Sequence, residues 1–320
     1  MYISRLINQA PFIAFLLCWI VLTISAPLFA QQEASFSQYM FNQQAVNPAY
    51  VGAQDFTQIT LLNHTQWINL EGAPETQALS AGTRLSEKIG IGISAVNDKI
   101  GPAQNTTTSI DFAYHISLND NNLKLGLGLK VSGRLNLLDL SGIQTIQTND
   151  NSFSIQPQDN ANINFGTGFY LYNQKFYIGL AVPFLLEEET FNLQRNYYII
   201  LGGIFQISES IQLKPSLLFQ KTHGVDLIYD NSLWIVFNNR FWVGPQYRAA
   251  IKSIVPSKNM GGFFGAIAGI HLGKNISLGY AYQGRIGNQA LGITNTTHEI
   301  LLRFQFVSKF KGVLRSPRLF

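Results

Sequence analysis

The side chains that could carry out acid–base, nucleophilic or metal chemistry are few and far apart in the sequence. The five histidines are His64, His115, His223, His271 and His298. Of these, only His298 has a carboxylate at a spacing that metal ligands could have, and that carboxylate is Glu299. The two side chains point to opposite faces of a strand, because successive residues alternate. The single cysteine, Cys18, lies in a segment that we expect to be removed. We therefore predict no metal site and no cofactor.

Two other groups are candidates for catalysis or ion binding. His223 lies close to Asp226 between two predicted strands, and the pair is a faint match to a base with its partner. The run at 187–189 is all glutamate and could bind a cation, although an acidic loop is usually a solvated surface. No phosphate-binding loop is present, because the glycines lie within predicted strands, where small residues ease packing or barrel curvature. We predict no catalytic residue and no enzymatic activity.

The composition is typical of a membrane β-barrel. Charged residues make up 12% of the 320 residues, which is about half of the usual share in soluble proteins. Beyond residue 30, no apolar run approaches the roughly 20 residues that a membrane helix needs. Much of the net charge of +4 comes from the basic residues after position 307. No basic stripe with interleaved aromatic residues is present, so we expect no nucleic-acid partner.

The elements that must position any site are strands, because apolar and polar residues alternate. Between Leu123 and Leu137 the odd positions hold Leu, Val or Gly, whereas the even positions include Lys124, Lys130 and Arg134. A period of two places one set on each face of a strand. In a membrane barrel the apolar set faces lipid and the polar set faces the lumen.

We predict an all-β, transmembrane antiparallel β-barrel of about fourteen strands. Single-chain bacterial barrels have an even number of strands, and twelve or sixteen remain alternatives. The predicted strands are 57–67, 77–86, 88–97, 105–119, 122–136, 161–172, 175–185, 196–208, 210–220, 224–237, 240–251, 261–273, 275–285 and 297–307.

Tight turns alternate with longer connections, such as 98–104 and 137–160, and 221–223 is a short exception. This alternation is expected of periplasmic turns and extracellular loops. The alternative fold, a soluble β-sandwich, has no reason to show it. Aromatic residues near strand ends are interpreted as interfacial girdles, and these residues are Tyr170, Tyr172, Tyr197, Trp234 and Trp242.

Two further segments complete the predicted organisation around the barrel at 57–307. Residues 1–30 have a basic start, an apolar middle and a small residue, Ala30, at the end, which is the layout of a cleaved signal peptide. The alternative is a transmembrane anchor. The basic tail at 308–320 is expected in the periplasm, where it could contact an acidic partner. The signal predicts export to the outer membrane, with lipid around the barrel.

Residues 31–56 form an N-terminal segment that we expect to be ordered. Three aromatic residues fall within positions 36–41, and Asn47-Pro48-Ala49-Tyr50 before Gly52 is a turn signal, because proline fixes φ and glycine tolerates unusual backbone angles. We predict that this segment packs as a plug in the lumen or lies across the periplasmic mouth.

The phrase FSQYMFNQQAVNPAYVG at 36–52 closely resembles the opening of the PorP/SprF family of type IX secretion outer-membrane proteins. Members typically begin with FSQYM, Phe or Tyr, and Asn, followed by four variable residues and NPAYAG. Here Val51 replaces the usual alanine. The matching positions are candidates for partner binding, and they are Phe36, Ser37, Gln38, Tyr39, Met40, Phe41, Asn42, Asn47, Pro48, Ala49, Tyr50 and Gly52.

The resemblance implies a non-enzymatic outer-membrane protein of the Bacteroidota that acts in type IX secretion or gliding motility. It implies two kinds of partner: a secreted adhesin or other cargo protein, whose export or surface anchoring the barrel supports, and periplasmic peptidoglycan-binding secretion components. The alternative function is a passive solute channel, similar to the fourteen-stranded fatty-acid transporters.

Overall fold

The computed structural model describes residues 35–68, 70–118, 123–139, 160–187, 193–223, 225–251, 262–285 and 296–307. The predicted signal peptide, most of loop 137–160 and the basic tail lie outside these residues. The fold below is that of the unit Gln31–Phe320.

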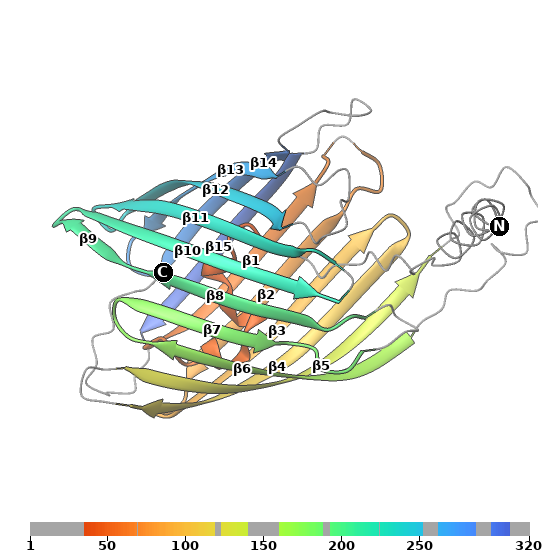
Figure 1. The fold of residues 1–320 in the computed structure, drawn as a ribbon, viewed down its shortest axis with the longest axis horizontal. Coiled ribbons are helices and arrows are strands. Elements are labelled where there is room, and N and C mark those ends of the chain that lie inside the picture. The colour runs from red at the N-terminus through yellow and green to blue at the C-terminus, as the bar shows by residue number, and fades with distance from the viewer. Residues whose placement is uncertain are drawn as a thin grey trace, which may run out of the picture. The chain divides into compact units, whose positions relative to one another are not determined.

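Fourteen antiparallel strands close into a barrel, as predicted (Figure 1). Each strand pairs with its neighbour in sequence, except that β10 pairs with both β8 and β11, and the barrel closes where β15 pairs with β1. The described residues form β1 (Phe56–Gln66), β2 (Glu75–Arg84), β3 (Ile89–Ile100), β4 (Ala103–Ser117), β5 (Lys124–Leu138), β6 (Asn160–Tyr172), β7 (Phe176–Val182), β8 (Asn196–Gly203), β9 (Phe205–Ser208), β10 (Ile211–Thr222), β11 (Leu227–Phe237), β12 (Phe241–Ile251), β13 (Phe263–Leu272), β14 (Ile276–Arg285) and β15 (Thr296–Val307).

The short strand β9 is additional to the closed barrel. It follows β8 after a break at Ile204 and pairs with β10 alone. The sequence predicted one strand over 196–208, so the break between Gly203 and Phe205 is a correction. Two successive glycines before the break weaken the strand, because glycine has no side chain to pack and loses more backbone entropy on ordering.

Alternation along the strands separates an apolar outer surface from a polar interior, as predicted. On β5, Lys124, Lys130 and Ser132 are buried inside, whereas Leu129 and Val131 are exposed on the outside. The final strand follows the same rule. A period of two therefore decides which side chains face the lumen.

The two ends of the barrel differ in their connections. The end that holds Phe56 and Val307, paired at the closing seam, carries most of the tight turns, and we call it the turn end. The opposite end is the loop end. The predicted long connection 98–104 is wrong, because β3 and β4 extend to a tight turn at Gly101 and Pro102.

Four of the five residues assigned to aromatic girdles face the lumen instead. Tyr170, Tyr172, Trp234 and Trp242 are buried, and only Tyr197 is exposed on the outer surface. The prediction used position along the strand and ignored the alternation, which places these four with the lumenal set. Among the described residues, no helix is long and apolar enough to cross a membrane.

Candidate functional site: the filled lumen

Residues 35–55, which we call the lumenal segment, lie inside the barrel and fill its lumen. Three short helical turns make up its centre, η1 (Tyr39–Phe41), α2 (Gln43–Val46) and η2 (Pro48–Tyr50). Their side chains are almost completely buried, and Met40, Phe41 and Ala49 are 0% exposed. The lumen is therefore occupied by the chain's own N-terminal part.

The local fold of the lumenal segment follows from its turn residues. The Asn47 side chain accepts a hydrogen bond from the backbone N–H of Ala49 at 2.9 Å, which caps the turn that Pro48 begins. Gly52 then adopts φ of +78°, a left-handed angle that favours glycine. These residues reverse the chain so that it enters β1 at the turn end.

A buried carboxylate at the loop end holds the start of the lumenal segment. Glu299 on β15 accepts hydrogen bonds from the backbone N–H groups of Ser37 and Gln38, both at 2.7 Å. The same carboxylate contacts Nδ1 of His64 on β1 at 2.8 Å. Because these donors have no access to water, loss of the carboxylate would leave them unsatisfied in the interior.

A second carboxylate reinforces this attachment from another part of the wall. Asp230 on β11 forms an ion pair with Arg248 at 2.7 Å, and Arg248 donates to the carbonyl oxygen of Phe36 at 3.0 Å. Gln246 connects Asp230 to the lumenal segment. Its side-chain amide donates to Asp230 at 2.8 Å and to the carbonyl oxygen of Ser37 at 2.7 Å. The backbone of the segment is thus bound at both its donors and its acceptors.

The middle of the lumenal segment rests on a charged pair. The Gln44 amide donates to Asp111 on β4 at 3.0 Å, and Lys130 on β5 pairs with Asp111 at 3.0 Å. Both charged side chains are almost fully buried. Ser80 on β2 also donates to the Asn42 side chain at 2.6 Å. Buried charges are stable only when paired and hydrogen-bonded, as they are here.

Phe41 lies in an aromatic socket of the wall. Its ring centroid is 5.0 Å from that of Trp234 and 5.4 Å from that of Trp242. The guanidinium carbon of Arg303 lies 4.8 Å from the same ring. Aromatic pairing and cation–π attraction add to the burial of the Phe41 side chain.

Replacing Phe41 by alanine is expected to lower the free energy of unfolding by about 3–5 kcal/mol, which is the usual cost of removing a buried phenylalanine. Urea unfolding of the purified protein, followed by loss of heat-modifiable mobility on electrophoresis, would measure the change. Phe306→Ala is the matched control, since Phe306 is 47% exposed on the outer surface. Equal destabilisation of both variants would contradict the prediction that the aromatic socket holds Phe41.

Glycines on the inner wall give the lumenal segment its space. A Cβ at Gly128 would lie 2.1 Å from the backbone nitrogen of Ala49, and one at Gly90 would lie 2.1 Å from the carbonyl oxygen of Val51. A Cβ at Gly168 would lie 2.1 Å from the side-chain oxygen of Asn47. The wall is therefore complementary in shape to the NPAYVG phrase.

The lumenal segment is fixed again at the turn end. Arg84 donates to the carbonyl oxygens of Gly52 at 2.9 Å and Ala53 at 3.2 Å, and it pairs with Asp55. His115 Nε2 lies 2.9 Å from the carbonyl oxygen of Val51. Because a carbonyl can only accept, this ring nitrogen carries a proton and donates to it.

The structure brings together every residue of the candidate partner-binding set, inside the lumen. All of these residues are buried, so in this state they contact the barrel wall. Sequence reasoning missed the wall residues that hold them, above all Asp111, Asp230 and Glu299. A signal was present for Asp111, because it lies between the apolar residues Ile110 and Phe112 on a strand and therefore belongs to the lumenal set.

The remaining candidate groups do not form a reactive centre in the part of the chain that the structure describes. His298 points outward against Tyr280 and Tyr282, while Glu299 points inward, as predicted. His223 is exposed on the turn after β10. No group of three or more potential metal ligands occurs among the described residues. Among the described residues, the arrangement holds the chain's own lumenal segment.

The closed strands, apolar outer surface and polar filled interior define an outer-membrane β-barrel protein. The family model for the type IX secretion system membrane protein PorP/SprF matches residues 28–304. The chain therefore belongs to the PorP/SprF family, which confirms the resemblance seen in the opening phrase. No curated protein matches the chain.

Solved structures with a similar fold are outer-membrane barrels and channels. The outer membrane protein Omp33 of Acinetobacter baumannii is 9% identical with a TM-score of 0.44, covering 80% of this chain and 100% of that one. A FadL homologue of Pseudomonas aeruginosa is 12% identical with a TM-score of 0.44, covering 82% and 92%. A deletion mutant of the monoaromatic hydrocarbon channel TodX is 11% identical with a TM-score of 0.46, covering 82% and 93%.

Proposed function

We propose that this protein is a non-enzymatic barrel that supports the export or surface anchoring of a secreted partner, such as an adhesin, in type IX secretion. The observation that carries the proposal is the filled lumen. Because the family phrase is buried against the wall along its whole length, the barrel serves as a closed scaffold whose loops and turns are available to other proteins.

The lumenal segment then acts on partners through the shape of the barrel. Its contacts reach β15 through Glu299, β11 through the backbone carbonyl of Asp230 and β4 through Asp111, so one segment ties distant strands together. Removing the segment would leave these charged side chains in an empty lumen. Because the strands carry the loops and turns, the positions of these connections would no longer be fixed by contacts inside the lumen.

Deletion of residues 31–52 is expected to abolish surface display of the cognate secreted protein while the barrel still reaches the outer membrane. Flow cytometry with an antibody to the secreted partner would measure display in living cells. Heat-modifiable mobility of the barrel in outer-membrane fractions would show whether it has folded. Unchanged display with a folded, shortened barrel would contradict the role of the segment.

Loss of the whole gene tests the function separately from the segment. The expected result is that the partner protein accumulates inside the cell or is released, and that wild-type protein restores display. Normal display without the gene would contradict the proposed function itself, whatever the deletion of residues 31–52 had shown.

Conductance distinguishes the scaffold from a passive solute channel. Purified wild-type protein in planar bilayers is expected to show no steady conductance, because the lumenal segment occupies the lumen. The barrel without residues 31–52 is expected to conduct ions. Steady conductance by the wild-type protein would favour the channel.

A further inference from the structure

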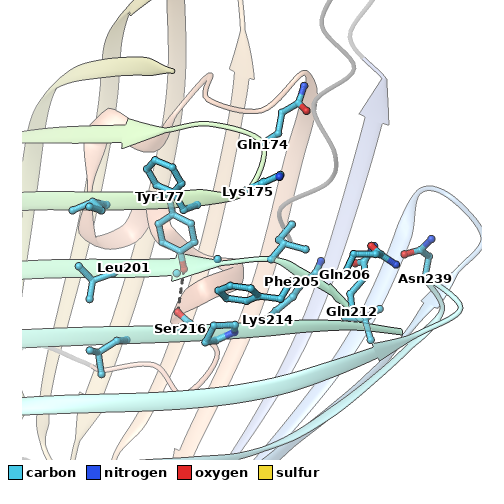
Figure 2. Close-up of a pocket in the computed structure, with 18 of the residues that line it drawn as sticks. Gln174, Lys175, Tyr177, Leu201, Phe205, Gln206, Gln212, Lys214, Ser216 and Asn239 are labelled. Carbon is cyan, nitrogen blue, oxygen red and sulfur yellow. Dashed lines mark hydrogen bonds between the residues drawn. The ribbon is translucent and has the colours of Figure 1, made fainter. Parts of the chain in front are cut away.

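A cavity of about 1880 Å³ lies at the turn end of the lumen, where β7, β8, β9 and β10 form the wall (Figure 2). Tyr177 and Ser216 line its inner part, and their hydroxyl groups are 3.0 Å apart. Gln174, Lys175 and Asn239, which lie on tight turns, also line it, so the cavity opens at the turn end. Short turns of bacterial outer-membrane barrels lie on the periplasmic side. The cavity is therefore accessible from the periplasm.

The wall beside the cavity is interrupted. The pairing of β8 with β10 ends at Gly202 and Ser216, and the pairing of β9 with β10 begins at Phe205 and Leu213. Pro215, which lies in the interval, has no backbone N–H to donate. The ladder is thus open between Leu213 and Ser216, and side chains from both faces of the wall reach the cavity.

Beyond this interruption, β9 presents an open backbone edge. Among the strands that the structure describes, β9 pairs with β10 alone, and all of its residues are exposed. The turn before β7 contacts the chain just ahead of β9, where the backbone N–H of Ile204 donates to the carbonyl oxygen of Lys175 at 2.8 Å. Residues 205–208 continue past that turn. Their edge offers backbone N–H and C=O groups to another extended chain, as edge strands do.

The two faces of β9 have different characters. Phe205 and Ile207 are 58% and 64% exposed, and they are apolar like the rest of the outer surface. Gln206 lies opposite Gln212 in the ladder, and both line the cavity. Successive side chains of a strand point to opposite faces. A chain paired with β9 would therefore place alternate side chains beside Phe205 and Ile207, and the intervening ones toward the cavity.

The cavity is basic. Lys175 is exposed at its rim, and the buried Lys214 has its ammonium nitrogen 5.2 Å from the centroid of the Trp234 ring. Lys274, on another turn, is a third lysine in the lining, and the described lining residues include no aspartate or glutamate. Glu209, on the turn after β9, does not line the cavity. Acidic side chains that a paired chain directs into the cavity would meet a complementary charge.

We propose that the edge of β9 and the adjoining cavity bind an extended acidic segment of a periplasmic polypeptide. The segment adds a strand beside β9, with aspartate or glutamate at every second position toward the cavity and apolar residues between them. The cavity is larger than the roughly 300–1,000 Å³ that is usual for small-molecule sites, which favours a polypeptide. The proposal does not depend on the role in surface display, because binding is measured on the purified protein.

A rhodamine-labelled peptide, Val-Glu-Val-Glu-Val-Glu, tests the proposal. Its binding to the purified full-length protein in detergent micelles is measured by fluorescence anisotropy. The binding is expected to saturate, and the peptide with lysine in place of glutamate is expected to bind about tenfold more weakly or worse, because like charges repel.

Backbone methylation of the peptide tests strand pairing separately from charge. The N–H groups of alternate residues in a strand point to the same edge, so only one set faces β9. N-methylation of either all valines or all glutamates, but not of both sets in turn, is therefore expected to weaken binding about tenfold or more, since several hydrogen bonds are lost together.

Two substitutions test the location. Lys175→Glu is expected to weaken binding about tenfold, because an attraction beside the open edge becomes a repulsion. Lys88→Glu is the matched control, since Lys88 is exposed on the turn between β2 and β3 at the same end and does not line the cavity. Gln206→Glu, which adds a negative charge to the cavity face of β9, is the second variant if Lys175→Glu fails to fold.

A benzophenone at the end of the peptide locates the site by crosslinking and mass spectrometry, with crosslinks expected at residues 174–178 and 203–208. Equal binding of the glutamate and lysine peptides, full binding by both N-methylated peptides, or crosslinks spread over the barrel would each overturn the proposal. Unchanged affinity in both Lys175→Glu and Gln206→Glu would also reject it. Displacement of the peptide by free glutamate at the same concentration would instead indicate a small-anion site.

Discussion

Gly128→Ala is expected to displace the lumenal segment from the wall and to destabilise the protein by about 3 kcal/mol, the upper end of the usual cost of overpacking. The added Cβ would lie 2.1 Å from the backbone nitrogen and 2.5 Å from the Cα of Ala49. Both are backbone atoms that cannot rotate away. Either the segment or the strand must move, and Asn47 and Pro48 would lose their contacts with β6.

Limited proteolysis of the folded barrel measures this displacement directly. The bonds of residues 35–52 are expected to be protected in the wild type and to be cleaved in Gly128→Ala. Gly133→Ala is a matched control on the same strand, because Gly133 faces outward and its nearest neighbour to an added Cβ is Thr108 Oγ1 at 3.7 Å. If the two variants were cleaved alike, the close fit of the segment to the glycines would be refuted.

Glu299→Ala is expected to have a comparable effect at the other end of the lumenal segment. The substitution leaves the N–H groups of Ser37 and Gln38, as well as His64, without their acceptor in a buried site. Each buried donor that is left unsatisfied costs about 1–3 kcal/mol. Release is expected to begin at the loop end and to leave the Arg84 contacts in place.

Hydrogen exchange followed by mass spectrometry separates local release from global unfolding. In Glu299→Ala, exchange is expected to rise at residues 35–42 while the strand amides of β3 to β6 stay protected. Glu87→Ala, at an exposed glutamate in a tight turn, controls for loss of a carboxylate. Unchanged exchange at residues 35–42 would show that Glu299 does not hold the segment.

The architecture of the barrel was largely predictable from local pattern. Alternation on β5 assigned Lys124 and Lys130 to one face and Leu129 to the other, and the structure agrees because a strand has no other way to orient successive side chains. The tight turn at Gly101 was not predicted, since Asp98, Lys99 and Gln104 at the strand ends are equally common in loops. Pairing with the neighbouring strand extended β3 and β4 beyond those expected ends.

The contents of the lumen were less predictable, because they depend on contacts between distant residues. Trp234 and Trp242 are of a residue type that is common at lipid interfaces. In the structure they instead contact Phe41, which lies about 200 positions away in the sequence. The glycines were correctly expected to ease packing, whereas the partner to which they are fitted was not identified. A single sequence shows which residues face inward but not which of them touch.

The attachment of Ser37 to Glu299 also constrains how the protein assembles. The two residues are 262 positions apart, and Glu299 belongs to the strand that completes the barrel by pairing with β1. Contacts of such long range form late, because much chain entropy is lost before they are made. The first part of the chain to be synthesised therefore completes its contacts with the wall only when the last strand arrives.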